Sequence, residues 1–114
     1  MVCRIVVSDR AETDLEDAFI YLAERSPVAA ARWYRHVRIA IESLSEMPAR
    51  CPLAPETAKL GFNLRHLVIG QHPSRYRIVF RIIEENQEVH VLTVRHGARR
   101  PLADEDIMPY LELP

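Results

Sequence analysis

The sequence predicts an α+β protein in which one antiparallel sheet carries a hairpin of two helices on one face. Three observations support this prediction. Two adjoining segments repeat apolar residues with a helical period, three later segments alternate like strands, and a short β-branched segment precedes the helices. The chain has 114 residues, of which 48% are hydrophobic and 27% charged. This size and composition are typical of one folded domain, which we assign to residues 1–114.

The first strand and the first helix are predicted next to each other. Residues 3–7 are short and rich in β-branched side chains, which favours a strand. Ser8 or Asp9 then caps a helix that is expected to run to about Arg25. With Asp9 as the cap, Glu12 completes a capping box. The apolar stripe of this helix consists of Ala11, Leu15, Ala18, Phe19 and Leu22.

A second helix is predicted to start at Ser26 and Pro27, because serine is a favoured cap and proline is tolerated at the first helical position. Pro48 ends its pattern. The turn between the helices is so short that they must lie antiparallel. Residues 48–62, with three prolines and Gly61, are predicted to form a loop. The apolar stripe of the second helix consists of Ala30, Trp33, Tyr34, Val37, Ile41 and Leu44.

Three strands are predicted in the second half of the chain, at 64–69, 75–84 and 88–96, with turns at 70–74 and 85–87. The central strand alternates apolar residues with arginines, so one side is apolar and the other is cationic. We expect the helices to cover the apolar side and the arginines to face outward from the open side. If the N-terminal segment joins this meander, the sheet has four strands.

Turn length sets the register of the last two strands. A three-residue turn keeps apolar residues opposite apolar ones, whereas a two-residue turn would place Arg77 opposite His96. His96 lies at the strand exit, and its side chain is left open to turn either way. Asp104 is expected to cap a last helical turn that Pro109 limits. The pairs that follow from the three-residue turn are Phe80–Leu92, Ile78–Val94 and Arg77–Arg95, with His96 on the Tyr76 side.

Charge is concentrated in one part of the chain. The net charge is only −1, which excludes an overall basic coat, yet residues 61–100 hold seven arginines against three glutamates. The planar guanidinium suits phosphate and carboxylate groups. A solvated strand face also explains such arginines, but their mutual repulsion favours an anion or an acidic partner. The candidate binding residues are Arg65, Arg75, Arg77, Arg81, Arg95, His96, Arg99 and Arg100.

The sequence lacks the motifs of several other kinds of functional site. The five histidines lack metal-ligand spacing, and a P-loop, a dinucleotide fingerprint and a nucleophile elbow are missing, so we expect no metal and no cofactor. Cys3 and Cys51 are predicted to be reduced thiols. Arg50, next to Cys51, would lower a thiol pKa, but no base is placed beside it. Without a signal peptide or a membrane span, the expected location is the cytoplasm.

Taken with the two capped helices, the segments 64–67, 76–82 and 91–100 resemble the RelE/ParE toxin superfamily of bacterial type II toxin–antitoxin systems. The resemblance covers nearly the whole chain. It implies the fold described above and a growth-inhibiting toxin, of the kind that stabilises plasmids, held in a hetero-oligomer by its cognate antitoxin. RelE-like members cleave messenger RNA in the ribosome, whereas ParE-like members inhibit DNA gyrase.

The residues after the last strand favour the ParE-like activity, which is not enzymatic. Arg77 matches the strand arginine of the nucleases, and Arg99 or Arg100 matches the arginine after their final strand. The tyrosine that commonly follows is replaced by the acidic stretch 101–106. On this reading the candidate residues contact gyrase or the antitoxin. The alternatives are a ribosome-dependent messenger-RNA endonuclease using Arg77, His96, Arg99 and Arg100, or a non-toxic module that still binds antitoxin.

Overall fold

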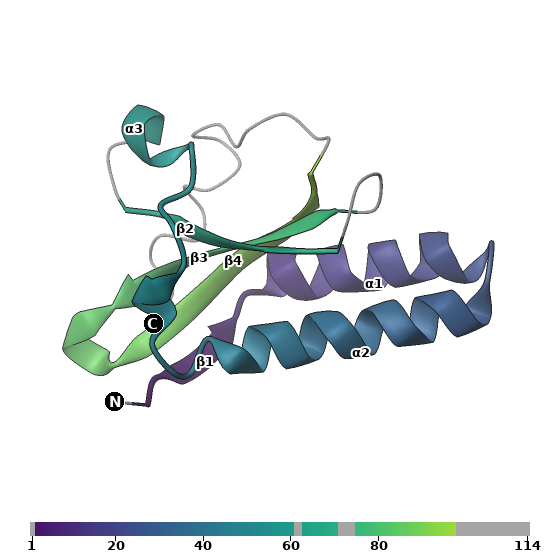
Figure 1. Cartoon of the computed structure of the whole chain (residues 1–114), viewed down its shortest axis with the longest axis horizontal. Coiled ribbons are helices and arrows are strands. Elements are labelled where there is room, and N and C mark those ends of the chain that lie inside the picture. The colour runs from purple at the N-terminus through teal and green to yellow at the C-terminus, as the bar shows by residue number, and fades with distance from the viewer. Residues whose placement is uncertain (1, 61–62, 71–74, 98–114) are drawn as a thin grey trace.

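The computed structural model describes residues 2–60, 63–70 and 75–97, and shows two antiparallel helices under one twisted sheet (Figure 1). The α+β class is confirmed. The predicted last helical turn, and most of the predicted turn at 70–74, lie outside the described residues. The elements are β1 (Arg4–Val7), α1 (Asp9–Ala23), α2 (Pro27–Ser43), η1 (Pro48–Arg50), α3 (Thr57–Leu60), β2 (Arg65–Ile69), β3 (Tyr76–Ile83), η2 (Glu84–Asn86) and β4 (Glu88–His96).

Both long helices begin at a serine cap. The Ser8 hydroxyl accepts a hydrogen bond from the Ala11 N–H at 3.0 Å, and Ser26 accepts one from the Ala29 N–H at 3.2 Å. Ser8, rather than Asp9, is therefore the cap of α1. Its hydroxyl also donates to the Leu92 carbonyl at 2.9 Å, which ties the start of α1 to β4. None of the described helices is long and apolar enough to cross a membrane.

The hydrophobic core lies between the helical hairpin and one face of the sheet. The prediction that the helices cover the apolar side of the central strand is confirmed. Trp33 and Tyr34 pack against this core, and the Trp33 ring lies 5.1 Å from that of Tyr76 between centroids. Its most deeply buried members include Leu15, Val37, Ile41, Leu44, Ile78, Phe80 and Val91.

The sheet has four strands in the order β1-β4-β3-β2. The meander of β2, β3 and β4 is antiparallel, as predicted, but β1 runs parallel to β4, so the sheet is mixed. Parallel neighbours need a long crossover, and the two helices form part of the connection that allows it. Strand β1 therefore adds an edge beside the last strand in the chain.

The predicted register is right at one end of β3 and wrong at the other. Ile78 faces Val94 as expected, but Phe80 faces Val91 instead of Leu92. The turn between β3 and β4 spans four residues, with η2 followed by Gln87 at φ 53°, and the ladder shifts by one residue between Val79 and Phe80. This β-bulge compensates for the longer turn and restores the expected pairs toward the end of β4.

The face of the sheet away from the helices is not open in the way the sequence suggests, because Val79, Thr93 and Arg95 are buried there. The segment predicted as a loop contains η1 and α3, and part of it lies along the outer edge of β2. Ala54 N–H donates to the Leu64 carbonyl at 2.7 Å, and His66 N–H donates to the Pro52 carbonyl at 3.2 Å. An edge strand needs partners for its backbone groups, and this segment supplies them.

Candidate functional site

The structure divides the predicted constellation between the two faces of the sheet. Arg77 stands opposite Arg95, and the next pair along the ladder is Tyr76 with His96. Successive side chains of a strand point to opposite faces, so the two arginines lie on one face and His96 on the other. The His96 ring packs edge-on against Tyr76, with centroids 5.1 Å apart. His96 therefore lies on the helix side of the sheet.

Arg77 is held by a carboxylate of its own chain. Its Nη2 lies 2.6 Å from Oε2 of Glu56, and its Nη1 lies 3.2 Å from Oε1, so the contact is bidentate. The Glu56 side chain is 0% exposed and that of Arg77 is 13% exposed. A buried carboxylate and a largely buried guanidinium in this geometry neutralise each other.

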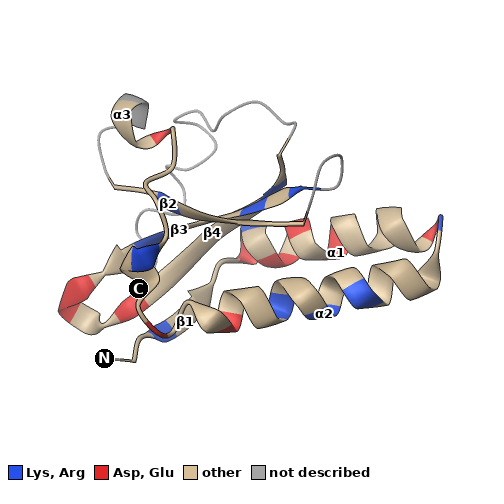
Figure 2. Cartoon of the chain, in the orientation of Figure 1, with Lys and Arg blue, Asp and Glu red and all other residues tan. Residues whose placement is uncertain are grey.

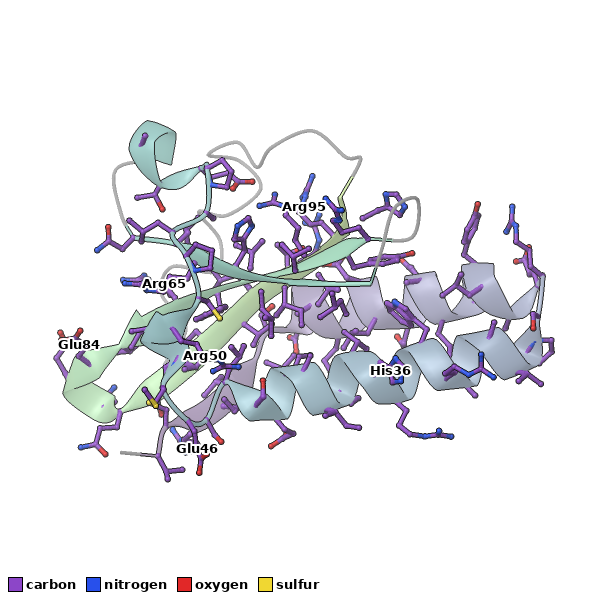
Figure 3. The ribbon with its side chains drawn as sticks, viewed as in Figure 1. His36, Glu46, Arg50, Arg65, Glu84 and Arg95 are labelled. Carbon is purple, nitrogen blue, oxygen red and sulfur yellow. The ribbon has the colours of Figure 1, made fainter. Side chains whose placement is uncertain are left out.

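The other candidate arginines differ widely in exposure. Arg95 is only 1% exposed, and Figure 3 shows it on the side of the sheet away from α1 and α2. Arg65 donates to the Cys51 carbonyl at 2.6 Å, and Arg81 is half-buried. Arg75 is the exposed member of the set within the described residues. Arg99 and Arg100 lie outside them.

The expectation of an outward-facing arginine surface is therefore wrong for Arg77 and Arg95. The physical reason is the segment before β2, which carries Glu56 across the sheet to Arg77. Sequence reasoning missed Glu56 because it follows Pro55 in a predicted loop, where no periodic pattern shows the direction of its side chain. The role of the remaining cations in binding a partner stays a prediction.

His66 completes the cluster around Arg77. Its Nδ1 lies 3.1 Å from Nη1 of Arg77, and a guanidinium can only donate, so His66 accepts and is neutral in this contact. Burial lowers the pKa of His66, and the charge of Arg77 lowers it further, against an opposing effect of Glu56. Nothing in the spacing of the histidines in the sequence indicates this contact.

Acid is expected to destabilise the protein through His66. The unfolded chain takes up this proton near pH 6.5, the ordinary histidine pKa, whereas the folded chain does so only at lower pH. The stabilisation is therefore full at pH 7.5 and is lost as the pH falls from about 6.5 through the folded pKa. Urea unfolding midpoints of the wild type and of His66→Gln, at pH 7.5 and 5.5, measure the effect.

The His66→Gln variant should show a smaller loss of stability on acidification than the wild type. His36→Gln is the matched control, because His36 is exposed on α2 and should leave the loss unchanged. Equal losses in the wild type and His66→Gln would show that the contact with Arg77 does not govern this pH range.

Glu88 and His90 form a second buried polar cluster, on β4. Oε1 of Glu88 lies 3.0 Å from Nε2 of His90, and the other carboxylate oxygen pairs with Arg4 of β1. These hydrogen bonds, from His90 first and then Arg4, lower the pKa of Glu88. The cluster joins β1 to β4 and has a structural role.

The two cysteines are buried free thiols. Burial raises the pKa of the Cys51 thiol, and the charges of Arg50 and Arg65 oppose the shift without cancelling it. The net direction is opposite to the one that Arg50 suggests in the sequence, and a raised pKa does not favour a nucleophile. Within the described residues, no three His, Cys, Asp or Glu side chains are grouped as metal ligands.

A polar cleft of about 440 Å³ lies on the helix side, between α1 and the ends of β3 and β4. Asp14 and Asp17 line it from α1, together with the phenols of Tyr21 and Tyr76 and the imidazole of His96. Figure 2 shows acidic positions along α1 and basic positions along α2. Nothing in the sequence shows that these two aspartates meet His96, because they lie about 80 residues before it in the chain.

Comparisons with known proteins agree on one class. Residues 5–101 match the family model described as ParE toxin of type II toxin-antitoxin system, parDE. The chain is 33% identical to toxin RelE1 of Caulobacter vibrioides over 97 residues, which cover 85% of this chain and 96% of that toxin. It is 32% identical to toxin ParE2 of Mycobacterium tuberculosis over 106 residues, which cover 92% and 91%.

Solved structures share the fold at lower identity. A mutant of Escherichia coli toxin RelE in the free state superposes with a TM-score of 0.60 and 15% identity, over 86% of each chain. A chain of the toxin–antitoxin complex RelBE2 from Mycobacterium tuberculosis gives a TM-score of 0.56 and 24% identity, over 84% of this chain and 99% of that one.

The helical hairpin, the sheet and these similarities define a small toxin of the RelE/ParE superfamily. More specifically, the chain belongs to the ParE toxin family of type II toxin–antitoxin systems. The resemblance inferred from the strands and their arginines is thereby confirmed.

Proposed function

We propose that this toxin inhibits DNA gyrase and is neutralised by a cognate antitoxin with which it forms a hetero-oligomer in the cytoplasm. The match to the ParE toxin family over residues 5–101 carries the proposal. A solved relative in a toxin–antitoxin complex supports an antitoxin partner. We also propose that residues 1–114 act as one domain, and that Arg75, Arg99 and Arg100 contribute to partner binding.

The geometry of the sheet counts against RNA cleavage at the predicted residues. Cleavage needs cations for the phosphate and an acid or base beside them in one site. His96 lies on the opposite face of the sheet from Arg77 and Arg95. The Arg77 guanidinium is also bound by Glu56, so a phosphate would have to displace a buried carboxylate.

Purified toxin tested on DNA gyrase distinguishes the activities. We expect supercoiling to be inhibited or the cleavage complex to accumulate, and we expect prior addition of the antitoxin encoded beside the toxin to restore gyrase activity. A parallel cell-free translation reaction should leave the messenger RNA intact. Unchanged gyrase activity would contradict the proposal.

The second candidate is a ribosome-dependent messenger-RNA endonuclease, because relatives of 33% identity are named RelE1 and RelE2. Messenger RNA cut in the same translation reaction, together with unaffected gyrase, would favour this candidate. The third is an inactive antitoxin-binding module. Induced expression without growth inhibition, but with antitoxin still bound, would favour that one.

A further inference from the structure

The cleft beside His96 has a composition that no step of the proposed toxin function uses. It brings the acidic face of α1 against two phenols, and among the described residues neither lysine nor arginine lines it. Ala18 and Val94 supply apolar surface between the polar groups. Such a mixture of carboxylate, aromatic ring and apolar surface suits a cation with a flat or apolar body.

The two carboxylates in the cleft differ in the number of hydrogen bonds that they accept. Asp14 accepts from the Val94 N–H at 3.0 Å, from the Thr93 hydroxyl, and from Arg10 Nε at 3.2 Å. Asp17 is exposed, and no side chain of the described residues forms a hydrogen bond or ion pair with it. The carboxylate left for a ligand is therefore that of Asp17.

Tyr76 supplies a second, independent indication of a ligand. Its side chain lines the cleft although the residue is only 8% exposed, and its hydroxyl has no hydrogen-bond partner among the described residues. Burial raises the pKa of this phenol, and the nearby Tyr21 raises it further, so the hydroxyl is protonated. Among the described residues this hydroxyl is not one of the fully buried atoms without a partner, so it is reachable from the cleft and can accept a hydrogen bond from a ligand there.

Tyr21 shows that a guanidinium fits this surface. The Arg25 guanidinium lies over the Tyr21 ring, 3.9 Å from its centroid. The residue is 53% exposed and lies at the rim of the cleft. A second planar cation can therefore approach between the exposed part of Tyr21, the Asp17 carboxylate and the Tyr76 hydroxyl.

We propose that this cleft binds the guanidinium of an arginine side chain from a protein partner, with Asp17 as the charge partner and the Tyr76 hydroxyl as an acceptor. The proposal goes beyond the gyrase proposal and does not depend on it. It assigns to the helix side of the sheet a docking point of opposite charge to the arginines of the other face.

The chain's own arginines are the alternative occupant. Arg99 and Arg100 follow two and three residues after Gly97 in the sequence. The Gly97 N–H, however, donates to the Arg75 carbonyl at 2.7 Å, so the chain is still held to β3 as it passes the cleft. In Figure 1 the described end of the chain rises away from α1, which carries Asp17. The titration below separates this occupant from a partner's arginine.

Titration of the full-length chain with acetyl-Gly-Arg-Gly-amide, followed by amide chemical shifts, tests the proposal. We expect shifts at Asp17, Tyr21 and His96, and none with the neutral citrulline peptide. Asp17→Asn should weaken binding about threefold to fivefold, as expected for the loss of a charge pair at a partly exposed site. Tyr76→Phe, which removes only the hydroxyl, should also weaken it.

Glu16→Gln is the matched control. It makes the same change of charge at the next residue of α1, but its side chain lines a different hollow, beside Phe19 and Ile20. Equal shifts with arginine and citrulline, or equal weakening in Glu16→Gln and Asp17→Asn, would overturn the proposal. Tighter binding of spermidine than of the arginine peptide would assign the cleft to a free polyamine. Binding seen only after Arg99→Ala and Arg100→Ala would assign it to the chain itself.

Discussion

Replacement of Glu56 by alanine is expected to lower the free energy of unfolding by about 3–5 kcal/mol, the usual effect of removing one partner from a buried ion pair. The variant leaves the Arg77 guanidinium, whose side chain is 13% exposed, without the bidentate carboxylate. It also leaves His66 as the next polar neighbour, which can accept only one hydrogen bond. Urea unfolding followed by circular dichroism measures the change.

Two further variants separate the contribution of the ion pair to stability from that of side-chain packing. Glu56→Ala combined with Arg77→Met removes both charges, and we expect it to recover part of the lost stability. Glu12→Ala breaks the pair with Arg38, whose side chains are 48% and 35% exposed, and should change stability by less than about 1 kcal/mol. If Glu56→Ala behaves like Glu12→Ala, the buried pair does not stabilise the fold.

Replacement of Asp14 by alanine is expected to cost about 2–4 kcal/mol, because it leaves two donors in a buried region without their acceptor. These donors are the Val94 N–H and the hydroxyl of Thr93, a residue that is 3% exposed. Val94 lies beyond the last residue of β4 that pairs with β1, so Asp14 takes the place of a neighbouring strand there. The unfolding free energy and the hydrogen-exchange rate of the Val94 amide test this.

The hydrogen-exchange rate of the Val94 amide distinguishes a local effect of Asp14 from a general loss of stability. We expect the Val94 amide of Asp14→Ala to exchange faster by a larger factor than the amides of residues 89–91, which lie where β1 still covers the edge. Asp17→Ala is the control on the same helix and should stay within about 0.5 kcal/mol of the wild type. A uniform rise in exchange along β4 would contradict the role of Asp14 as a substitute strand.

Local features of the chain were predictable because their causes are local. The second helix begins at Ser26 and Pro27 as predicted, since the cap and the fixed proline φ act within one turn. The last strand runs over the predicted residues 88–96. The polar residues at 85–87 indicate the turn that precedes it. The apolar stripes of both helices and of β3 likewise identified the side of the sheet that is covered.

The positions and partners of the side chains in the candidate site depend on contacts between segments that are distant in the sequence. The pair of Glu56 with Arg77 joins residues 21 apart, and the contact of Asp14 with Val94 joins residues 80 apart. Periodicity cannot show such pairs, because Glu56 lies in an irregular segment and Asp14 on a half-exposed helix face. The same limit applies to the four-residue turn and its bulge, which offset each other in the register.

The order of the two long helices and four strands, the cap of α2, the covered side of the sheet and the family were predictable from the sequence. These depend on propensity and periodicity, which each segment carries within itself. The folded chain was needed to show that Glu56 neutralises Arg77, that Arg95 is buried, and that His96 faces α1. Such outcomes depend on how burial, charge pairing and backbone hydrogen bonding balance once the segments meet.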